Sequence, residues 1–473
     1  MSRVRDSLTV VQVPHAPGRS GDALTATVLG IIAATMYTIF SARQWASIVV
    51  PSWDLGIFTQ LARRYAAVES PIVQIKGEGY NLLGDHFHPL LVLLGPVYAA
   101  FPHAFTLLVV QNLLFGLACA VLAHTAMQLL GRGSGLLVGG ACAVSWGLQG
   151  AVEAQFHEIA FAVPLLALSL TALLRRHFVA CAAWAMPLVF VKEDLGLTVA
   201  AIGVVLAYRS RTPLGIWLAS WGVAWFGVAS LIVLPALNPQ DEWAYAGSID
   251  LPGLLSDPSS LFHPEKGVTL LMLALAGGFI ALRSPLALVL LPTLAWRFVS
   301  DNPGYWGHTW QYSAVLMPIV FCALVDAVVQ SRASRHRWMV RFGRRAPVIV
   351  VIVALALLPQ LPLAKLLHPS EHFSTSRAEA AQAAVARVPD NAVVVSDIGL
   401  MNYLVDRSTV YWVGNDNPVP DYIVVDLVAG GLPAEWTTVA EAARVMHPHA
   451  RFQTVFSRDG FEVAERVGTV SRP

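Results

Sequence analysis

The chain has 473 residues, of which 56% are hydrophobic and only 13% are charged, and its mean hydropathy is +0.59. This composition excludes an ordinary soluble domain, in which about 25% of residues are charged, and it indicates a multi-pass membrane protein. The formal net charge of +1 argues against a nucleic-acid partner, because basic residues are not clustered for phosphate binding outside a single loop.

The apolar runs predict the membrane-spanning helices. Residues 1–22 are polar and the run 23–42 lacks a small-residue cleavage site, so we expect a cytoplasmic tail and an uncleaved first helix. A helix needs roughly twenty apolar residues to cross the hydrocarbon, and about eleven runs within a transmembrane domain over residues 23–367 qualify or nearly qualify. They lie near 23–42, 104–130, 135–150, 158–174, 178–191, 195–208, 213–237, 267–282, 285–299, 312–330 and 347–367.

The distribution of Lys and Arg between these runs predicts their orientation. Alternate loops carry basic residues without Asp or Glu, which is typical of cytoplasmic loops. They contain Arg132, Arg175, Arg176, Arg209, Arg211, Arg283 and the run 331–345. That last run also suits a lipid or nucleic-acid patch, but the positive-inside pattern favours a cytoplasmic loop. We therefore expect a plasma-membrane protein with a cytoplasmic N-terminus, whose acids, histidines and tryptophans gather on the outer face.

The first outer loop, residues 43–103, contains SWDLGIFTQ at residues 52–60, just outside the first span. A helix over residues 54–65 would place Asp54 at the end of an apolar stripe. There Asp54 is either a functional carboxylate or merely a helix N-cap, and the spacing does not separate the two. Gln60 in the same segment is a candidate for substrate binding.

The same loop later reads LGDHFHP, which brings Asp85, His86 and His88 together. Carboxylate and imidazole groups bind divalent metals and orient phosphates, so these three residues are possible metal ligands. The alternative is that the histidines only form hydrogen bonds with the backbone of the loop.

Polar residues also stand where the next outer loop, EAQFHE, separates two spans. Glu153 and His157 are four residues apart, so a continuing helix would place them on one side. They are candidates for substrate binding, or else a hydrogen-bonded pair at the membrane interface.

Lys192, Glu193 and Asp194 interrupt an otherwise apolar stretch. Ionisable groups at membrane depth are costly, and they usually pair or line a polar cavity. Lys192 is suited to neutralise a substrate phosphate, with Glu193 or Asp194 holding it in place. The alternative is a purely structural ion pair.

Two further outer loops, residues 238–247 and 301–312, are rich in polar and aromatic side chains. Aromatic faces stack on sugar rings, which makes His308, Trp310 and Tyr312 candidates for substrate binding. An interfacial belt of Trp and Tyr is the alternative.

Residues 368–473 change in character. Short β-branched runs such as AVVVSD and DYIVVD alternate with segments of helical pattern such as SRAEAAQAAVARV. We expect a small extracytoplasmic α/β domain, placed outside by the number of spans before it. Its aspartates lie at strand ends and turns, where Asp is ordinary.

The motifs taken together resemble a known family. DLGIFTQ, GDHFHPLL, QFHEIAFAVPLL, VKEDLGL and HTWQYSAVLMP occur in the order found in the bacterial membrane family called domain of unknown function 2079. The layout is also remotely similar to the type C glycosyltransferases, which are polytopic and take sugars from polyprenyl-phosphate donors. In that resemblance Asp54 matches the acidic motif of the first outer loop, and His88 begins an approximate second element. The chain departs from the pattern at Leu55, where one branch has a second acid.

The resemblance implies an α-helical polytopic membrane protein that transfers a sugar from a polyprenyl-phosphate donor to an extracytoplasmic acceptor. Asp54, with a raised or matched pKa, would be the general base. Lys192 would hold the leaving phosphate, and a divalent metal is a possible cofactor. Two alternatives remain: a transporter or flippase for a lipid-linked or anionic solute, and a non-catalytic scaffold whose outer domain binds a partner.

Overall fold

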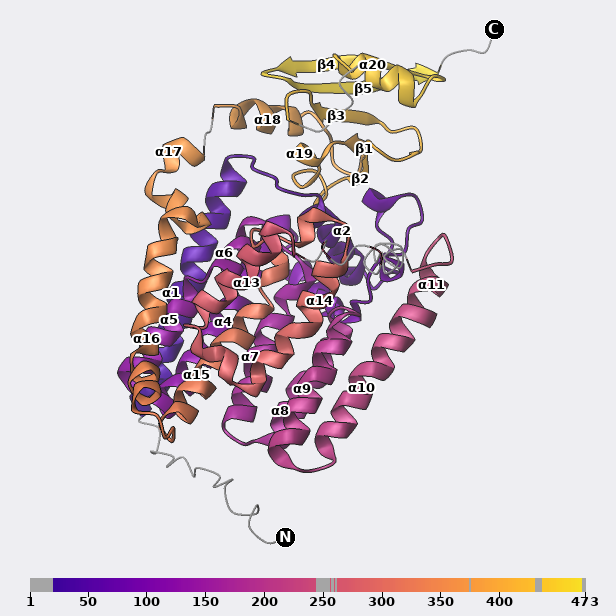
Figure 1. Cartoon of the computed structure of the whole chain (residues 1–473). Helices are drawn as coiled ribbons and strands as arrows, with labels where there is room; N and C mark the ends of the chain where they lie inside the picture. Colours follow the sequence, from indigo (N-terminus) through magenta and orange to yellow (C-terminus); the bar gives the residue numbers. More distant parts are fainter. Residues whose placement is uncertain are drawn as a thin grey trace.

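The structure is a computed structural model that describes residues 20–243, 256, 259, 262–373, 376–429 and 436–469. Residues 1–19 of the predicted tail and 244–247 of a predicted outer loop lie outside the described residues. A bundle of helices carries a small sheet domain at one end (Figure 1). We call this end of the bundle the domain face.

Within the described residues, six helical segments are long and apolar enough to cross a membrane. They are α1 (Ser20–Ala46), α4 (Ala104–Leu130), α5 with α6 (Arg132–Ala143 and Trp146–Glu153), α10 with α11 (Leu214–Val228 and Leu234–Leu237, joined by a π-turn), α15 (Leu316–Ser331) with the turn before it from Gln311, and α16 (Arg337–Leu357). Shorter apolar helices complete the bundle. They include α3 (Leu94–Ala100), α7 (Ala162–Leu174), α8 (Phe178–Ala185), α9 (Leu195–Ser210), α13 (Pro264–Ala276) and α14 (Leu291–Val299).

Two predicted segments differ from the structure, and one helix was not predicted. The run 267–282 is divided between α13 and a 3-10 turn at Ile280–Arg283, so it does not form one continuous helix. The last span begins at Arg337 instead of residue 347, because the basic run 337–345 is itself the start of α16. Long Arg side chains can lay their apolar stems along a helix and keep the charge outside. An unpredicted apolar helix, Pro89–Ala100, lies in the first outer loop.

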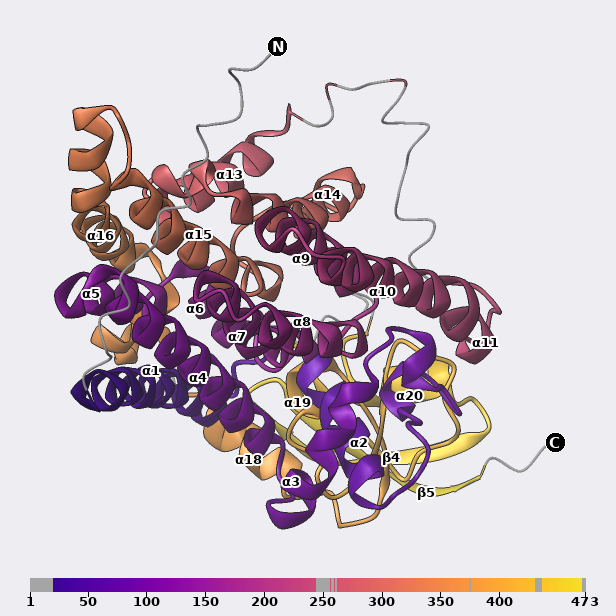
Figure 2. The same cartoon turned by 90° about the horizontal axis from the view of Figure 1, so that it is seen from below.

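Small residues let pairs of helices approach closely. A Cβ added to Gly203 of α9 would lie 2.4 Å from the backbone nitrogen of Ala219 in α10, and one added to Gly215 would lie 2.2 Å from the nitrogen of Ala207. Gly30 of α1 and Gly116 of α4 make a similar contact. Close backbone approach through small residues is a common way to pair helices in membranes. Figure 2 shows α9 beside α10 and α1 beside α4.

The C-terminal domain is a mixed five-stranded sheet in the order β2-β1-β3-β5-β4. Strands β1, β2 and β3 are parallel, whereas β5 runs antiparallel to β3 and β4. The strands are β1 (Val393–Ser396), β2 (Thr409–Trp412), β3 (Tyr422–Asp426), β4 (Ala450–Arg458) and β5 (Phe461–Thr469). The helices are α17 (Pro369–His372), α18 (Ala378–Val385), α19 (Ile398–Met401) and α20 (Val439–Met446). The predicted fold class, a helical bundle with a C-terminal α/β domain, is confirmed.

Helix α2 (Asp54–Ala66) lies between the bundle and the sheet domain (Figure 1). Its Gln60 side chain donates to the carbonyl oxygen of Val410 in β2 at 2.8 Å and accepts from the backbone N–H of Ile75 at 3.1 Å. A Cβ on Gly56 would lie 2.7 Å from Oδ1 of Asn402, so α2 packs closely against the domain at this position. These contacts fix α2, and with it the position of Asp54.

Candidate active site

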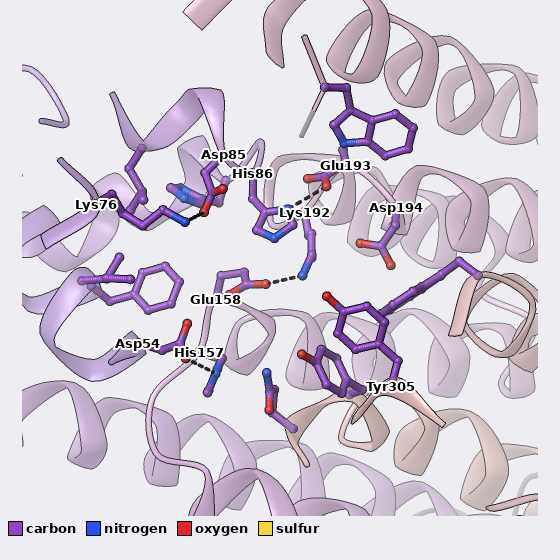
Figure 3. A pocket seen from close by; sticks show the side chains of 18 of the residues that line it. Asp54, Lys76, Asp85, His86, His157, Glu158, Lys192, Glu193, Asp194 and Tyr305 are labelled. Carbon is purple, nitrogen blue, oxygen red and sulfur yellow. Dashed lines mark hydrogen bonds and ion pairs between the residues drawn. The ribbon is translucent and has the colours of Figure 1, made fainter. Parts of the chain in front are cut away.

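A cavity of about 350 Å³ lies beside the first residue of α2 (Figure 3). Segments far apart in the sequence form its walls: the start of α2, the loop 76–88, the turn 157–158, the turn 192–194 and the aromatic loop before α15. Nine of the thirteen predicted site residues line it. They are Asp54, Asp85, His86, His88, His157, Lys192, Glu193, Asp194 and Tyr312.

Asp54 is the first residue of α2, and Trp53 precedes it as the N-cap without a side-chain capping bond. The alternative of Asp54 as a mere N-cap is therefore wrong in this structure. The Asp54 side chain is 28% exposed, and its Oδ2 lies 3.3 Å from Nε2 of the buried His157. His157 reaches it because Gln155 has a left-handed backbone (φ 71°) and its side chain donates to the carbonyl oxygen of Val49 just after α1.

The same turn separates Glu153 from His157. Helix α6 ends at Glu153, so the predicted pairing of these two side chains on a continuing helix is wrong. Glu153 forms an ion pair with Lys365 instead and does not line the cavity. A left-handed residue between two positions breaks the helical spacing on which that prediction depended.

The contacts of the two ring nitrogens of His157 indicate which of them carry protons. His157 Nδ1 lies 3.2 Å from the carbonyl oxygen of Gln155, which can only accept, so Nδ1 carries a proton. Nε2 then faces a carboxylate and needs a second proton. Burial opposes the charge of His157, but Asp54 outweighs it and raises the pKa of His157. Burial would likewise raise the pKa of Asp54, yet the imidazolium holds that pKa at about 2. The expected raised or matched pKa of Asp54 is therefore wrong, and Asp54 is ionised at neutral pH.

Lys192 occupies the middle of the cavity, where its Nζ lies 2.9 Å from Oε1 of Glu158 (Figure 3). Burial lowers the pKa of Lys192, but the Glu158 carboxylate outweighs burial and keeps that pKa well above its usual value. Lys192 is therefore a permanent cation, and both members of its pair with Glu158 line the cavity.

The loop 76–88 contributes two more ion pairs. Lys76 Nζ lies 3.1 Å from Oδ2 of Asp85. His86 Nδ1 lies 2.8 Å from Oε1 of Glu193, whose other oxygen accepts from the backbone N–H of Phe87 at 3.0 Å. Burial alone would raise the pKa of Glu193, but His86 lowers it to about 2.

The three possible metal ligands therefore have separate surroundings. Asp85 pairs with Lys76 and His86 pairs with Glu193, while His88 stands edge-on to Phe58 with Nδ1 lacking a hydrogen-bond partner. Burial lowers the pKa of His88 to about 4, so its ring is neutral. No group of three or more His, Cys, Asp or Glu side chains in the described residues is arranged to hold a metal. The donor set as arranged does not fit a metal, and metal dependence stays a prediction.

Asp194 differs from the other acids of the cavity. It forms no ion pair with any described residue, and its buried Oδ1 lacks a hydrogen-bond partner. Burial raises the pKa of Asp194 to about 6, although Lys192 opposes the shift. In Figure 3, Asp194 and Tyr305 lie on the side of the cavity opposite Lys76, Asp85 and Asp54.

The wall near Asp194 is aromatic. Trp296, Tyr305 and Tyr312 contact one another edge to face, with ring centroids 5.0 to 5.8 Å apart. The fully buried Arg297 holds their loop by donating to the carbonyl oxygens of Tyr305 and Gly307. Of the predicted aromatic candidates only Tyr312 lines the cavity, whereas His308 packs edge-on to Trp146 and Trp310 lies outside.

Several lining residues were not predicted as site residues, notably Trp53, Lys76, Glu158, Trp296 and Tyr305. Lys76 carried a usable signal, because it is one of only four lysines in the chain and lies in the first outer loop. Gln60 was predicted but binds the sheet domain and lines a separate cavity.

The sequence profile described as "Predicted membrane protein (DUF2079)" matches residues 45–463. No curated protein matches the chain in sequence. The fold is similar to the crystal structure of ArnT from Cupriavidus metallidurans bound to undecaprenyl phosphate, with a TM-score of 0.55 and 13% identity over 94% of this chain and 98% of that chain. The apo ArnT structure gives a TM-score of 0.51 at the same identity and coverage. At this identity, the likeness establishes the fold.

Proposed function

This chain belongs to the DUF2079 family of predicted membrane proteins, and from its fold and cavity we propose that it is an integral-membrane glycosyltransferase. The donor is a sugar linked to a polyprenyl phosphate, and the acceptor lies on the domain face, which we assign to the extracytoplasmic side. The similar ArnT structure holds undecaprenyl phosphate, which supports a donor of this class.

One observation carries the proposal. An ionised carboxylate, Asp54, opens into a cavity that also presents the ammonium groups of Lys76 and Lys192. A sugar transfer from a lipid phosphate needs a group that takes a proton from the acceptor and a cation that stabilises the leaving phosphate. The cavity provides both in one place.

In the proposed reaction, the acceptor hydroxyl oxygen attacks the anomeric carbon of the sugar. The bond from that carbon to the phosphate oxygen breaks, and its electron pair leaves with the polyprenyl phosphate. Asp54 accepts the hydroxyl proton, and His157 keeps the carboxylate ionised and oriented beforehand. Lys192, shared between Glu158 and the phosphate, stabilises the developing negative charge.

The test uses Asp54→Asn, which keeps the size of the side chain but removes the base. The purified wild type, incubated with undecaprenyl-phosphate sugars and a membrane extract as acceptor source, should release undecaprenyl phosphate, measured by lipid mass spectrometry. Asp54→Asn should reduce that release by about a hundredfold or more and should keep the donor bound.

The matched control is Asp390→Asn, an exposed acid of the C-terminal domain, which should turn over like the wild type. Full activity of Asp54→Asn would remove Asp54 from the mechanism. If the wild type releases no undecaprenyl phosphate from any of these donors, the whole proposal is contradicted.

A further inference from the structure

One of the carboxylates that line the cavity has no cationic partner among the described residues. Among the described residues, five carboxylates line it, and four have a cationic partner within 3.3 Å. These pairs are Asp54–His157, Asp85–Lys76, Glu158–Lys192 and Glu193–His86. Asp194 is the fifth, and no described cation lies within ion-pair distance of it. A buried acceptor without a partner is costly, and native sites keep such a group where a ligand completes it.

Other buried polar atoms of the lining also lack a hydrogen-bond partner among the described residues, including His88 Nδ1 and Trp243 Nε1. Gln311 is only 7% exposed and its Oε1 accepts no hydrogen bond. The indole Nε1 of Trp296 donates none. Trp296 contacts Tyr305 edge to face, and Figure 3 places Tyr305 on the same side of the cavity as Asp194. This end of the cavity thus offers the unpaired acceptor of Asp194, the unpaired donor of Trp296 and a cluster of aromatic faces.

That combination is complementary to a sugar ring. The hydroxyls of a sugar donate and accept hydrogen bonds, and its C–H face packs on aromatic rings. A phosphate lacks hydrogen-bond donors when ionised and would be repelled by Asp194. The paired cations Lys76 and Lys192 therefore suit the phosphate, whereas the end with Asp194 and the aromatic rings suits the sugar.

We propose that Asp194 and Trp296 bind the hydroxyls of the transferred sugar, so that this end of the cavity selects the sugar of the donor lipid. The inference rests on the proposed function, because it assigns one part of the same substrate. Asp194 accepts from a sugar hydroxyl, and Trp296 donates to a sugar oxygen. A polyprenyl phosphate without a sugar makes none of these contacts.

The experiment compares binding of two kinds of lipid to the purified full-length protein by native mass spectrometry. One probe is undecaprenyl phosphate, and the others are undecaprenyl-phosphate glucose, galactose, mannose and arabinose. The wild type should bind at least one sugar lipid more tightly than undecaprenyl phosphate. Asp194→Asn replaces the charged acceptor by a weaker neutral one, and Trp296→Phe removes the donor. Each should weaken the binding of that sugar lipid about tenfold and leave the binding of undecaprenyl phosphate unchanged.

Controls distinguish failure of the sugar site from failure of the proposed function. Trp338→Phe alters an exposed tryptophan away from the cavity and should change neither affinity, and Trp296→Phe keeps the ring should Asp194→Asn misfold. Equal weakening of both lipids, no weakening by either variant, or no preference of the wild type for any sugar lipid would overturn the sugar site alone. A wild type that binds neither kind of lipid would overturn the proposed function.

Discussion

At the scale of single residues, the charge of Asp54 depends on His157. One ring nitrogen of His157 is committed to the Gln155 carbonyl, so the other meets Asp54 only as an imidazolium. The pKa of His157 is raised in the folded protein. Its contribution to the stability of the fold is therefore complete below its ordinary pKa of about 6.5 and is lost as the pH rises through the raised value. The pKa of Asp54 is lowered, so the stability that its carboxylate adds to the fold is present above about pH 4 and is lost as the pH falls towards 2. The pair is intact between these limits.

His157→Gln should therefore change the pH profile of transfer as well as its rate. We expect the wild-type rate to fall on the alkaline side as His157 loses its proton, and the variant to lose that alkaline limb. The rate below the limb should fall by about ten- to a hundredfold, because Asp54 is no longer oriented. Release of undecaprenyl phosphate between pH 5 and 10 measures both effects.

His177→Gln, at an exposed position outside the cavity, is the control and should keep the wild-type profile. An unchanged alkaline limb in His157→Gln would mean that another group titrates there.

The sequence predicted nine cavity residues because polar side chains beside apolar spans cost free energy, so each of them was a candidate from its position alone. The same rule cannot separate a ligand-facing group from a structural one. Gln60 was as anomalous as Asp54, yet its amide holds β2 and the loop at Ile75. Which carboxylate would be left unpaired depends on the turns at residues 155 and 192–194, and no local pattern encodes that outcome.

At the scale of elements, the close pairing of α9 and α10 supports the turn that carries Lys192 and Asp194, since α9 begins at Leu195. Gly203→Ala should loosen this pair, because its new Cβ would lie 2.4 Å from a backbone nitrogen of α10 that cannot move aside cheaply. Overpacking of this kind costs about 1–3 kcal/mol. We expect a lower Tm in detergent and weaker transfer activity.

Gly227→Ala in α10 provides a control of opposite sign. No atom lies within 4 Å of the added Cβ, and replacing a helical glycine without strain stabilises by about 0.4–1 kcal/mol. Its Tm should be unchanged or slightly higher. Equal Tm values for the two variants would contradict the proposed role of the glycine contact.

Continuous apolar runs such as 104–130 and 158–174 gave the bounds of their helices correctly, because an uninterrupted apolar run marks both ends of such a helix. The predicted bounds were wrong where prolines or flanking arginines alter the ends of an apolar run. Pro359 and Pro362 end the last span early, and the arginines before it extend the helix in the other direction.

At the scale of the whole molecule, the sheet domain covers the segment that carries Asp54. Trp53 packs edge-on to Trp412 of β2 with ring centroids 5.0 Å apart, and Asn415 donates to the carbonyl oxygen of Ile75 at 2.9 Å. These contacts join residues more than 300 positions apart. The sequence predicted both parts but not their contact, because complementarity between distant surfaces has no periodic signal.

The orientation of the molecule is the last prediction. The charge pattern places the sheet domain outside and the basic turn before α16 in the cytoplasm. A cysteine at Ser457, exposed on β4, should react with a membrane-impermeant maleimide in right-side-out vesicles, whereas one at Ala333, exposed in the basic turn, should react only after permeabilisation. All four native cysteines are buried, so the unchanged protein is the unlabelled control. The reverse labelling pattern would put the cavity on the cytoplasmic face, where the acceptor would have to be a cytoplasmic molecule.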